Sequence, residues 1–320
     1  MVSLKVHRCR WSGAYPENSL PAIAECYHEA VARAEIDLQM LYDADFLVLH
    51  DSTLHSSTTG TGSVRDVTVS QAQVLRLLFH GNVSDERPPL CSEVVAVIRD
   101  LPSPTLLELD LVQFQPMPWP RVEELARMVE PVKDRVFLNG YDWNVRRLLE
   151  VDPTLTVAYD LLPYLDWLPK GNPEEAELQL PRGAYGYLDA HPLARERHTT
   201  VSEYIADRLG SLLRLVPGAR EAHLRLSTFE RMLDDGVVGV AAPFHRHGLL
   251  LDVWTLNAGT PGWKERLARA LAAGVDVITT DTPRDLSLAG NGEEELTTKD
   301  AESGMANWRE SGPSLRELKA

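Results

Sequence analysis

Histidines and charged residues gather near the start of this sequence, in two pairs. His7-Arg8 follows a short apolar segment, and His50-Asp51 follows another. An arginine can bind a phosphate group, and histidines can carry protons to and from a reacting atom. These residue types are suited to the cleavage of a phosphodiester, provided that the fold brings the two pairs together.

Acidic residues occupy alternate positions of two apolar segments. Side chains alternate across a β-strand, so Glu35 and Asp37 project to the same side, about two rises of ~3.3 Å apart. Glu108 and Asp110 repeat this spacing on a second segment. Acids that face a protein interior destabilise it unless they are paired or bind a metal, and carboxylate oxygens favour Mg²⁺ or Ca²⁺ over Zn²⁺. The alternative is that these acids pair with arginines or cap neighbouring elements.

Composition limits the classes of partner and compartment. The 320 residues suit one large domain, and the net charge of -15 argues against a nucleic-acid partner, because a phosphate backbone requires a basic face. The three cysteines form no CxxC pair, which favours a reducing compartment. We expect no signal peptide and no integral membrane segment, so the sequence predicts a cytoplasmic location. It does not indicate the oligomeric state.

Short apolar strands alternate with helical patterns, which is typical of a parallel α/β fold. The expected strands are Leu4–Arg8, Ala34–Met40, Phe46–His50, Thr105–Leu111, Arg135–Asn139, Leu155–Asp160, His223–Leu226, Leu249–Leu256 and Val275–Thr280. The expected helices are Pro21–Val31, Gln71–Leu78, Cys91–Arg99, Arg121–Val129, Trp143–Val151, Val201–Leu215, Thr228–Arg246 and Lys264–Ala273. About eight strand–helix units close a (β/α)8 TIM barrel, which we expect to span residues 1–288.

Two segments depart from this alternation. Residues 161–220 form an enlarged segment before the sixth strand, which is longer than an ordinary loop and helix. It is either a lid over the barrel or a helical insertion. Residues 289–320 are rich in glycine and acidic side chains, and we expect them to form a disordered acidic tail.

Ordered motifs give the sequence a family resemblance. They are His7-Arg8, Pro16-Glu17-Asn18-Ser19, Glu35-Ile36-Asp37, Val48-Leu49-His50-Asp51, the Ser/Thr/Gly run 57–62, Glu108, the run 252–257 and the run 274–283. Over roughly residues 4–285 the chain resembles the glycerophosphodiester phosphodiesterase family of phospholipase-C-like enzymes. The resemblance implies a TIM barrel with a small insertion after the second strand, at about residues 52–100.

The resemblance also implies roles for individual side chains. They are His7 and His50 as the acid/base pair, Glu35, Asp37 and Glu108 as ligands of a divalent metal (Mg²⁺ or Ca²⁺), Arg8 as the phosphate clamp, and Trp254 in the substrate pocket. Trp254 could instead be a core aromatic residue. Asp51 and Asp110 are further candidates. The sequence departs from the family pattern at Cys9, where glycine is usual, and at Asp110, where a lysine usually follows the third ligand by two residues.

These features predict a phosphoric diester hydrolase. A metal and two histidines would hydrolyse a glycerophosphodiester-like molecule to an alcohol and a phosphomonoester, in lipid metabolism. One alternative is a phospholipase-D-like lyase that forms a cyclic phosphate. A second is an enzyme of specialised metabolism that acts on another phosphorylated substrate, including a diphosphate. A third is a phosphate-binding protein without catalysis. In each case the expected partner is a small phosphorylated molecule.

Overall fold

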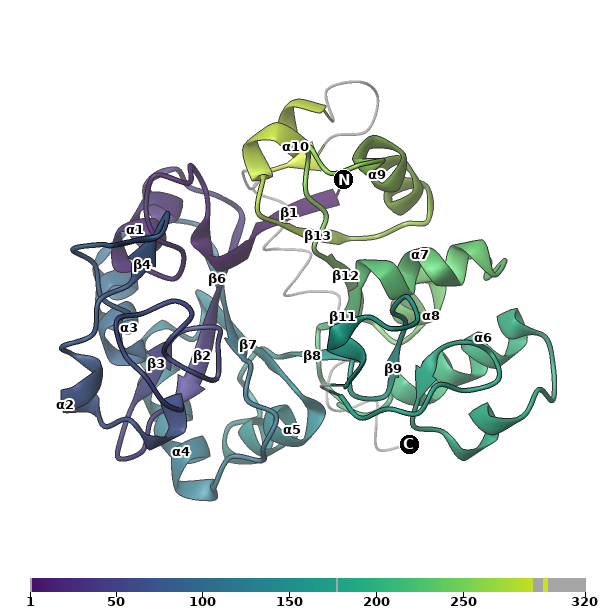
Figure 1. Cartoon of the computed structure of the whole chain (residues 1–320), viewed down its shortest axis with the longest axis horizontal. Helices are drawn as coiled ribbons and strands as arrows, with labels where there is room; N and C mark the ends of the chain where they lie inside the picture. The colour runs from purple at the N-terminus through teal and green to yellow at the C-terminus, as the bar shows by residue number, and fades with distance from the viewer. Residues whose placement is uncertain (1, 177, 290–295, 299–320) are drawn as a thin grey trace.

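Eight parallel strands form a barrel in the computed structural model, which describes residues 2–176, 178–289 and 296–298 (Figure 1). The barrel strands are β1 (Val2–Val6), β2 (Arg33–Met40), β6 (Leu106–Leu111), β7 (Val136–Gly140), β8 (Ala158–Asp160), β11 (Glu221–Arg225), β12 (Leu250–Trp254) and β13 (Val277–Thr280). They pair in the order β7-β6-β2-β1-β13-β12-β11-β8, and a parallel bridge from Leu138 to Val157 joins the two ends. The expected TIM barrel is confirmed.

Helices cover the outside of the barrel. They are α1 (Leu20–His28), α3 (Cys91–Asp100), α4 (Trp119–Val129), α5 (Asp142–Val151), α6 (Val201–Leu212), α7 (Leu226–Asp234), α8 (Ala241–Arg246), α9 (Trp263–Ala272) and α10 (Pro283–Ala289). In β2, the outward residues Ala34, Ile36 and Leu38 are fully buried in this shell. Glu35 and Asp37 alternate with them and so face the barrel interior. The apolar core therefore lies outside the strands, and the interior is available for polar side chains.

The register of β2 and β6 determines where the acids lie. Glu35 is paired with Glu108, and Asp37 is paired with Asp110 one pleat further along. Each pair forms a layer across the two strands, since residues two apart in a strand share a face. Asp37 and Asp110 belong to the layer nearer the carboxyl ends of the strands, which is where the active sites of TIM barrels lie.

A small insertion follows β3 (Phe46–Val48), which pairs antiparallel with β2. It contains a 3-10 turn at Val64–Asp66, α2 (Val69–Ala72), and a hairpin of β4 (Leu78–Phe79) and β5 (Asn82–Val83), around its own apolar cluster. The predicted helix Gln71–Leu78 is wrong, because α2 ends at Ala72. Beyond it, Leu75 and Leu77 are buried while Val74 and Arg76 are exposed, which is the alternation of an extended chain.

The helix Cys91–Arg99 is present as α3, and its buried face packs on the main core. The small insertion that the structure describes is therefore shorter than residues 52–100. The predicted helix Thr228–Arg246 is two helices, α7 and α8. Gly236 and Gly239 lie between them with φ of 79° and 64°, a left-handed conformation that glycine adopts readily and that ends a helix.

The enlarged segment, residues 161–220, contains strands β9 (Leu165–Asp166) and β10 (Leu188–Asp189), 3-10 turns at Pro173–Ala176 and Pro192–Arg195, and helix α6. Arg225, at the end of β11, is paired with Asp166 and Glu174 of this segment. The backbone N–H of Trp167 donates to Thr228 on α7. These contacts fix the segment beside the end of β11.

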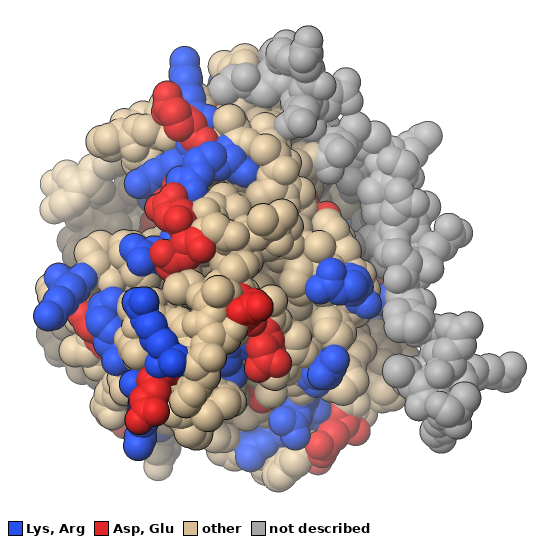
Figure 2. Space-filling model, turned by 90° about the vertical axis from the view of Figure 1, so that its right-hand side faces the viewer, with Lys and Arg blue, Asp and Glu red and all other residues tan. Residues whose placement is uncertain are grey.

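The tail expected at residues 289–320 lies mostly outside the described residues. Within it, β14 (Leu296–Thr297) is ordered and pairs parallel with β1. In the described part of the chain, no helix is long and apolar enough to cross a membrane. Figure 2, which shows the right-hand side of Figure 1, has basic and acidic side chains interspersed on that face.

Candidate functional site

The candidate site lies at the carboxyl ends of the barrel strands. The chain leaves β1 through a 3-10 turn, His7–Cys9, in which Arg8 and Cys9 have φ of 50° and 54°. This turn directs the chain into the loop before α1, whose first turn is capped by the Ser19 hydroxyl. The predicted residues His7 and Arg8 are thereby held above the open end of the barrel.

Three carboxylates meet at this end of the barrel. Glu35, Asp37 and Asp110 each offer an oxygen atom within 4.8 Å of the others. Burial, and then the neighbouring Asp37 and Asp110, raise the pKa of Glu35 well above its usual value. Burial, Glu108 and Asp37 do the same for the pKa of Asp110. One oxygen of Glu35 is buried without a hydrogen-bond partner. Such a group of acids is stabilised by a divalent cation with oxygen ligands.

Glu108 does not join this group, in contrast to the sequence-based prediction. Its carboxylate lies deeper in the barrel, where it binds the ammonium group of Lys5. Lys5 is fully buried and also contacts Asp252 and, at 3.3 Å, Glu221. A lysine ammonium therefore occupies the position at which Glu108 could otherwise hold a metal. Asp110 takes the place beside Glu35 and Asp37 that the prediction assigned to Glu108.

The deeper group of charges is balanced by the protein itself. Its acids are Glu108, Glu221 and Asp252, and its cations are Lys5, Arg33 and His223. Burial and Lys5 oppose protonation of His223, but Glu108, the hydrogen bond with Glu221 and Asp252 outweigh them and raise the pKa of His223 to about 9. With His223 protonated, three positive and three negative charges cancel. This group has no need of a metal, although its acids and histidine are close enough to hold one.

His223 had no role in the sequence-based prediction. The signal that could have found it is the alternation of Glu221, His223 and Arg225 along one strand, which directs all three into the barrel. Lys5, at the corresponding inward position of β1, carries the same signal.

His7 is oriented by Asp281, which follows β13. The His7 Nδ1 atom is 2.8 Å from a carboxylate oxygen of Asp281, and its Nε2 atom is 3.9 Å from Glu35. Burial disfavours the charge on Asp281, but the hydrogen bond and charge of His7, with Asn257 and Arg10, lower the pKa of Asp281 to about 2. Asp281 thus remains ionised and holds the ring so that Nε2 faces the acid group. It lies in the 274–283 motif, which the prediction left without a site residue.

Arg8 is bound on three sides. Its backbone N–H donates to Glu35 at 2.8 Å, its guanidinium donates to Glu17 at 2.8 Å, and its Nε lies 3.2 Å from Asp37. Asn18 donates to Asp37 at 2.7 Å and accepts from the Asp37 backbone at 3.2 Å. The loop before α1 therefore positions both a guanidinium and an amide against the acid group.

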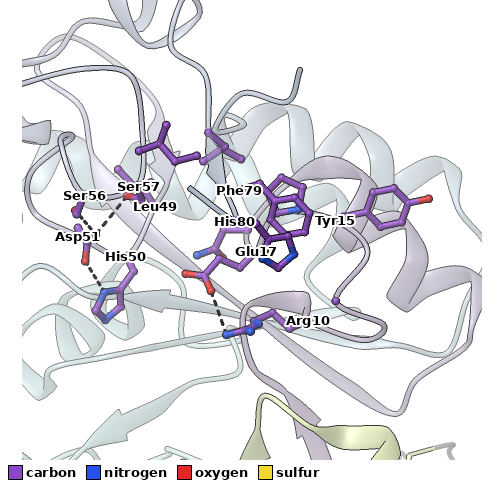
Figure 3. Close-up of a pocket in the computed structure, with 15 residues that line it drawn as sticks. Arg10, Tyr15, Glu17, Leu49, His50, Asp51, Ser56, Ser57, Phe79 and His80 are labelled. Atoms are coloured by element: carbon purple, nitrogen blue, oxygen red, sulfur yellow. Dashed lines mark hydrogen bonds and ion pairs between the residues drawn. The ribbon is translucent and has the colours of Figure 1, made fainter. Parts of the chain in front are cut away.

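His50 and Asp51 follow β3 and line a cavity together with residues of the loop before α1. The His50 Nδ1 atom is 3.1 Å from Asp51, which also accepts hydrogen bonds from Ser56 and Ser57. Burial opposes the charge on Asp51, but the hydrogen bonds from Ser56 and His50 outweigh it and lower the pKa of Asp51. Figure 3 shows His50 and Asp51 at one end of a cavity of about 340 Å³.

Trp254 lies at the carboxyl end of β12, on the same open end as His7. Its indole Nε1 is buried without a hydrogen-bond partner among the described residues. The guanidinium of Arg225, on the neighbouring strand, lies 5.1 Å from the centre of the Trp254 ring. A buried indole N–H without an acceptor is rare in cores, so the location supports a pocket position more than a core one.

Comparisons with known proteins relate part of this chain to one family of enzymes. Residues 7–162 match the model of the glycerophosphoryl diester phosphodiesterase family. A glycerophosphodiester phosphodiesterase from Caldanaerobacter subterraneus is 25% identical over 151 residues, which is 45% of this chain and 60% of that protein. The bovine glycerophosphodiester phosphodiesterase 1 is 33% identical over 85 residues, 25% of this chain and 26% of that protein. The chain thus spans less than two thirds of these relatives.

Solved structures share the barrel over almost the whole chain. A glycerophosphoryl diester phosphodiesterase from Parabacteroides distasonis covers 93% of this chain and 89% of its own, with 18% identity and a TM-score of 0.57. A phosphodiesterase from Oleispira antarctica, solved with the product sn-glycerol-3-phosphate, covers 90% and 96%, with 17% identity and a TM-score of 0.56. At these identities the likeness concerns the fold. The match over residues 7–162, just under half of the chain, relates that part of it to the glycerophosphoryl diester phosphodiesterase family.

Proposed function

We propose that the protein is a metal-dependent phosphodiesterase that hydrolyses a glycerophosphodiester-like substrate to an alcohol and a phosphomonoester. The observation that carries this proposal is the group of Glu35, Asp37 and Asp110, placed against His7 and Arg8. The family match and the named activity of the relatives support the same reaction class.

The residues present fit a divalent cation. Glu35, Asp37 and Asp110 would hold it, because they are crowded, buried acids and Glu35 retains an oxygen without a partner. Hard oxygen ligands suit Mg²⁺ or Ca²⁺. When bound, the cation would offset negative charge on the phosphate and polarise its P–O bonds. Arg8 would bind a second non-bridging oxygen of the phosphate, since guanidinium groups pair well with phosphate.

The two histidines would move the protons. Because Nδ1 of His7 is engaged by Asp281, its Nε2 atom is the one available to take a proton from an attacking water molecule. The water oxygen bonds to phosphorus as the bond from phosphorus to the alcohol oxygen breaks. His50, protonated and held by Asp51, would give its proton to that departing oxygen. If the substrate's own hydroxyl attacked instead, a cyclic phosphate would form first.

The test is turnover of glycerophosphocholine by metal-free protein to which Mg²⁺ or Ca²⁺ is restored. We expect activity with a restored cation and none after EDTA dialysis. His7→Ala and His50→Ala should each lower kcat by roughly 10²- to 10⁴-fold. His55→Ala is the matched control, because this exposed histidine lies in the small insertion, five residues after His50, and has no role in the proposal. Full activity in both site variants would refute the acid/base roles. Phosphorus NMR of the product distinguishes an open phosphomonoester from a cyclic phosphate.

A further inference from the structure

The cavity of about 340 Å³ lies between the loop before α1 and the small insertion (Figure 3). Asn18 lines it and also donates to Asp37 of the acid group. His50 lines it as well. A substrate whose phosphate lies at the acid group and whose departing oxygen takes a proton from His50 must therefore place its alcohol in this cavity. This step rests on the proposed function.

The acceptors of the cavity are already engaged by the protein. Asp51 accepts hydrogen bonds from Ser56, Ser57 and His50. Glu17 accepts from Arg8 at 2.8 Å, and its other carboxylate oxygen faces the Arg10 guanidinium at 3.5 Å. Both carboxylates are thus already placed against donors or cations of the protein, and three of the four lone-pair sites of Asp51 are in use.

The donors of the cavity are much freer. Within the described residues the Arg10 guanidinium makes no hydrogen bond, and its contacts to Glu17 and Asp281 are both 3.5 Å long. These distances exceed the 2.7–3.2 Å of an N–H···O hydrogen bond. Arg10 is 44% exposed and is drawn beside Glu17 in Figure 3. A guanidinium with free N–H groups in a cavity is suited to a carboxylate or a phosphate.

A second free donor is presented by a tight turn. His80 and Gly81 connect β4 to β5 with φ of 50° and 78°, the left-handed pair of a two-residue hairpin turn. Neither ring nitrogen of His80 has a hydrogen-bond partner in the part of the chain that the structure describes, and the ring packs 4.0 Å from that of Phe79. The turn therefore places an imidazole in the cavity wall, where glycine, asparagine or aspartate would suit the backbone better.

We propose that this cavity binds the leaving alcohol and selects one that carries an anionic group, a carboxylate or a second phosphate, through Arg10 and His80. The alcohol oxygen faces His50, and the anionic group lies at the opposite end, against the free N–H donors. Glu17 lies beside Arg10 and Asp51 holds His50, and neither acid contacts the ligand directly.

The test compares three diesters that share the glycerophosphate half. They are glycerophosphoglycerol, whose alcohol is neutral, glycerophosphoglycerate, which carries a carboxylate, and glycerophosphoglycerol phosphate, which carries a second phosphate. We expect kcat/KM to be about tenfold or more higher for at least one anionic diester, since a hydrogen bond to a charged group contributes at least that ratio. The anionic diester with the higher kcat/KM shows whether the cavity selects a carboxylate or a second phosphate.

Arg10→Gln should lower the ratio of anionic to neutral kcat/KM towards one, and His80→Asn, which suits the same turn, should lower it partly. Arg65→Gln is the control, an exposed arginine of the small insertion that does not line the cavity, and should keep the wild-type ratio. A ratio near one in the wild type, or a ratio that Arg10→Gln leaves unchanged, would overturn the proposed selectivity while turnover still supports the phosphodiesterase.

Calorimetric titration with 3-phosphoglycerate and glycerol 3-phosphate, in the presence of Mg²⁺, does not depend on turnover. Tighter binding of 3-phosphoglycerate than of glycerol 3-phosphate, lost in Arg10→Gln, supports the anionic subsite. If that binding is seen but no diester is cleaved, only the proposed function is refuted. Equal binding of the two ligands, together with no cleavage, would overturn both.

Discussion

The charged group inside the barrel predicts that protein stability depends on His223. The imidazole is fully surrounded by protein, with Glu221 at 2.9 Å and Glu108 at 3.8 Å, and its pKa is raised from 6.5 to about 9. A folded-state pKa above the unfolded value gives stability that is complete below pH 6.5 and is lost as the pH rises through about 9. At about 1.4 kcal/mol per pKa unit, the contribution is about 3 kcal/mol.

His223→Gln removes the titrating group and leaves Lys5 and Arg33 facing three carboxylates. We expect the variant to be less stable than the wild type by about 3 kcal/mol at pH 6.5, and by much less at pH 9.5, where the wild-type imidazole is neutral too. Urea unfolding followed by circular dichroism, at intervals between these two pH values, measures the difference directly. Groups that titrate in both proteins cancel in this comparison.

A stability difference that is the same at pH 6.5 and pH 9.5 would mean that His223 carries no proton in the folded state, and would exclude the charged imidazole as a source of stability. A difference that grows with pH would mean that the neutral imidazole is the form that the barrel stabilises.

Two predictions concern residues at the open end of the barrel. Asp281→Asn should lower kcat by roughly 10²-fold or more with little change in KM, because the amide cannot hold His7 with Nε2 free to accept a proton; steady-state kinetics with an unchanged kcat would contradict this orienting role. Trp254→Phe should raise KM about 2- to 10-fold, since the substrate would lose the one indole N–H donor. If Trp254→Phe instead lowers the melting temperature and leaves KM unchanged, Trp254 is a core residue.

Alternation along the strands was enough to predict which acidic side chains enter the barrel. Because side chains two apart share a face, Glu35 and Asp37 could be placed on one side of a strand before the barrel was known. The positions of His7 and His50 after apolar segments predicted their place at strand ends. These are local properties, which a sequence shows directly.

Which layer of the barrel each acid joins is not a local property. Glu108 and Asp110 have the same spacing as Glu35 and Asp37, so alternation cannot distinguish them. The decision depends on the pairing of β2 with β6 and on Lys5, which comes from a strand 103 residues away and neutralises Glu108. His223 was missed for the same reason, since its partners lie on strands distant in sequence. The missed turn after Ala72 reflects a further long-range effect, the packing of Leu75 and Leu77 into the small insertion.

We propose that Glu35, Asp37 and Asp110 form the metal site. Calorimetric titration of metal-free protein with Mg²⁺ and Ca²⁺ tests it most directly, with Asp110→Asn compared against Glu108→Gln and circular dichroism confirming that both variants are folded. We expect Asp110→Asn to weaken metal binding about tenfold or more, because one charged oxygen ligand is lost, and Glu108→Gln to bind the metal as the wild type does. Loss of binding in Glu108→Gln with full binding in Asp110→Asn would contradict it.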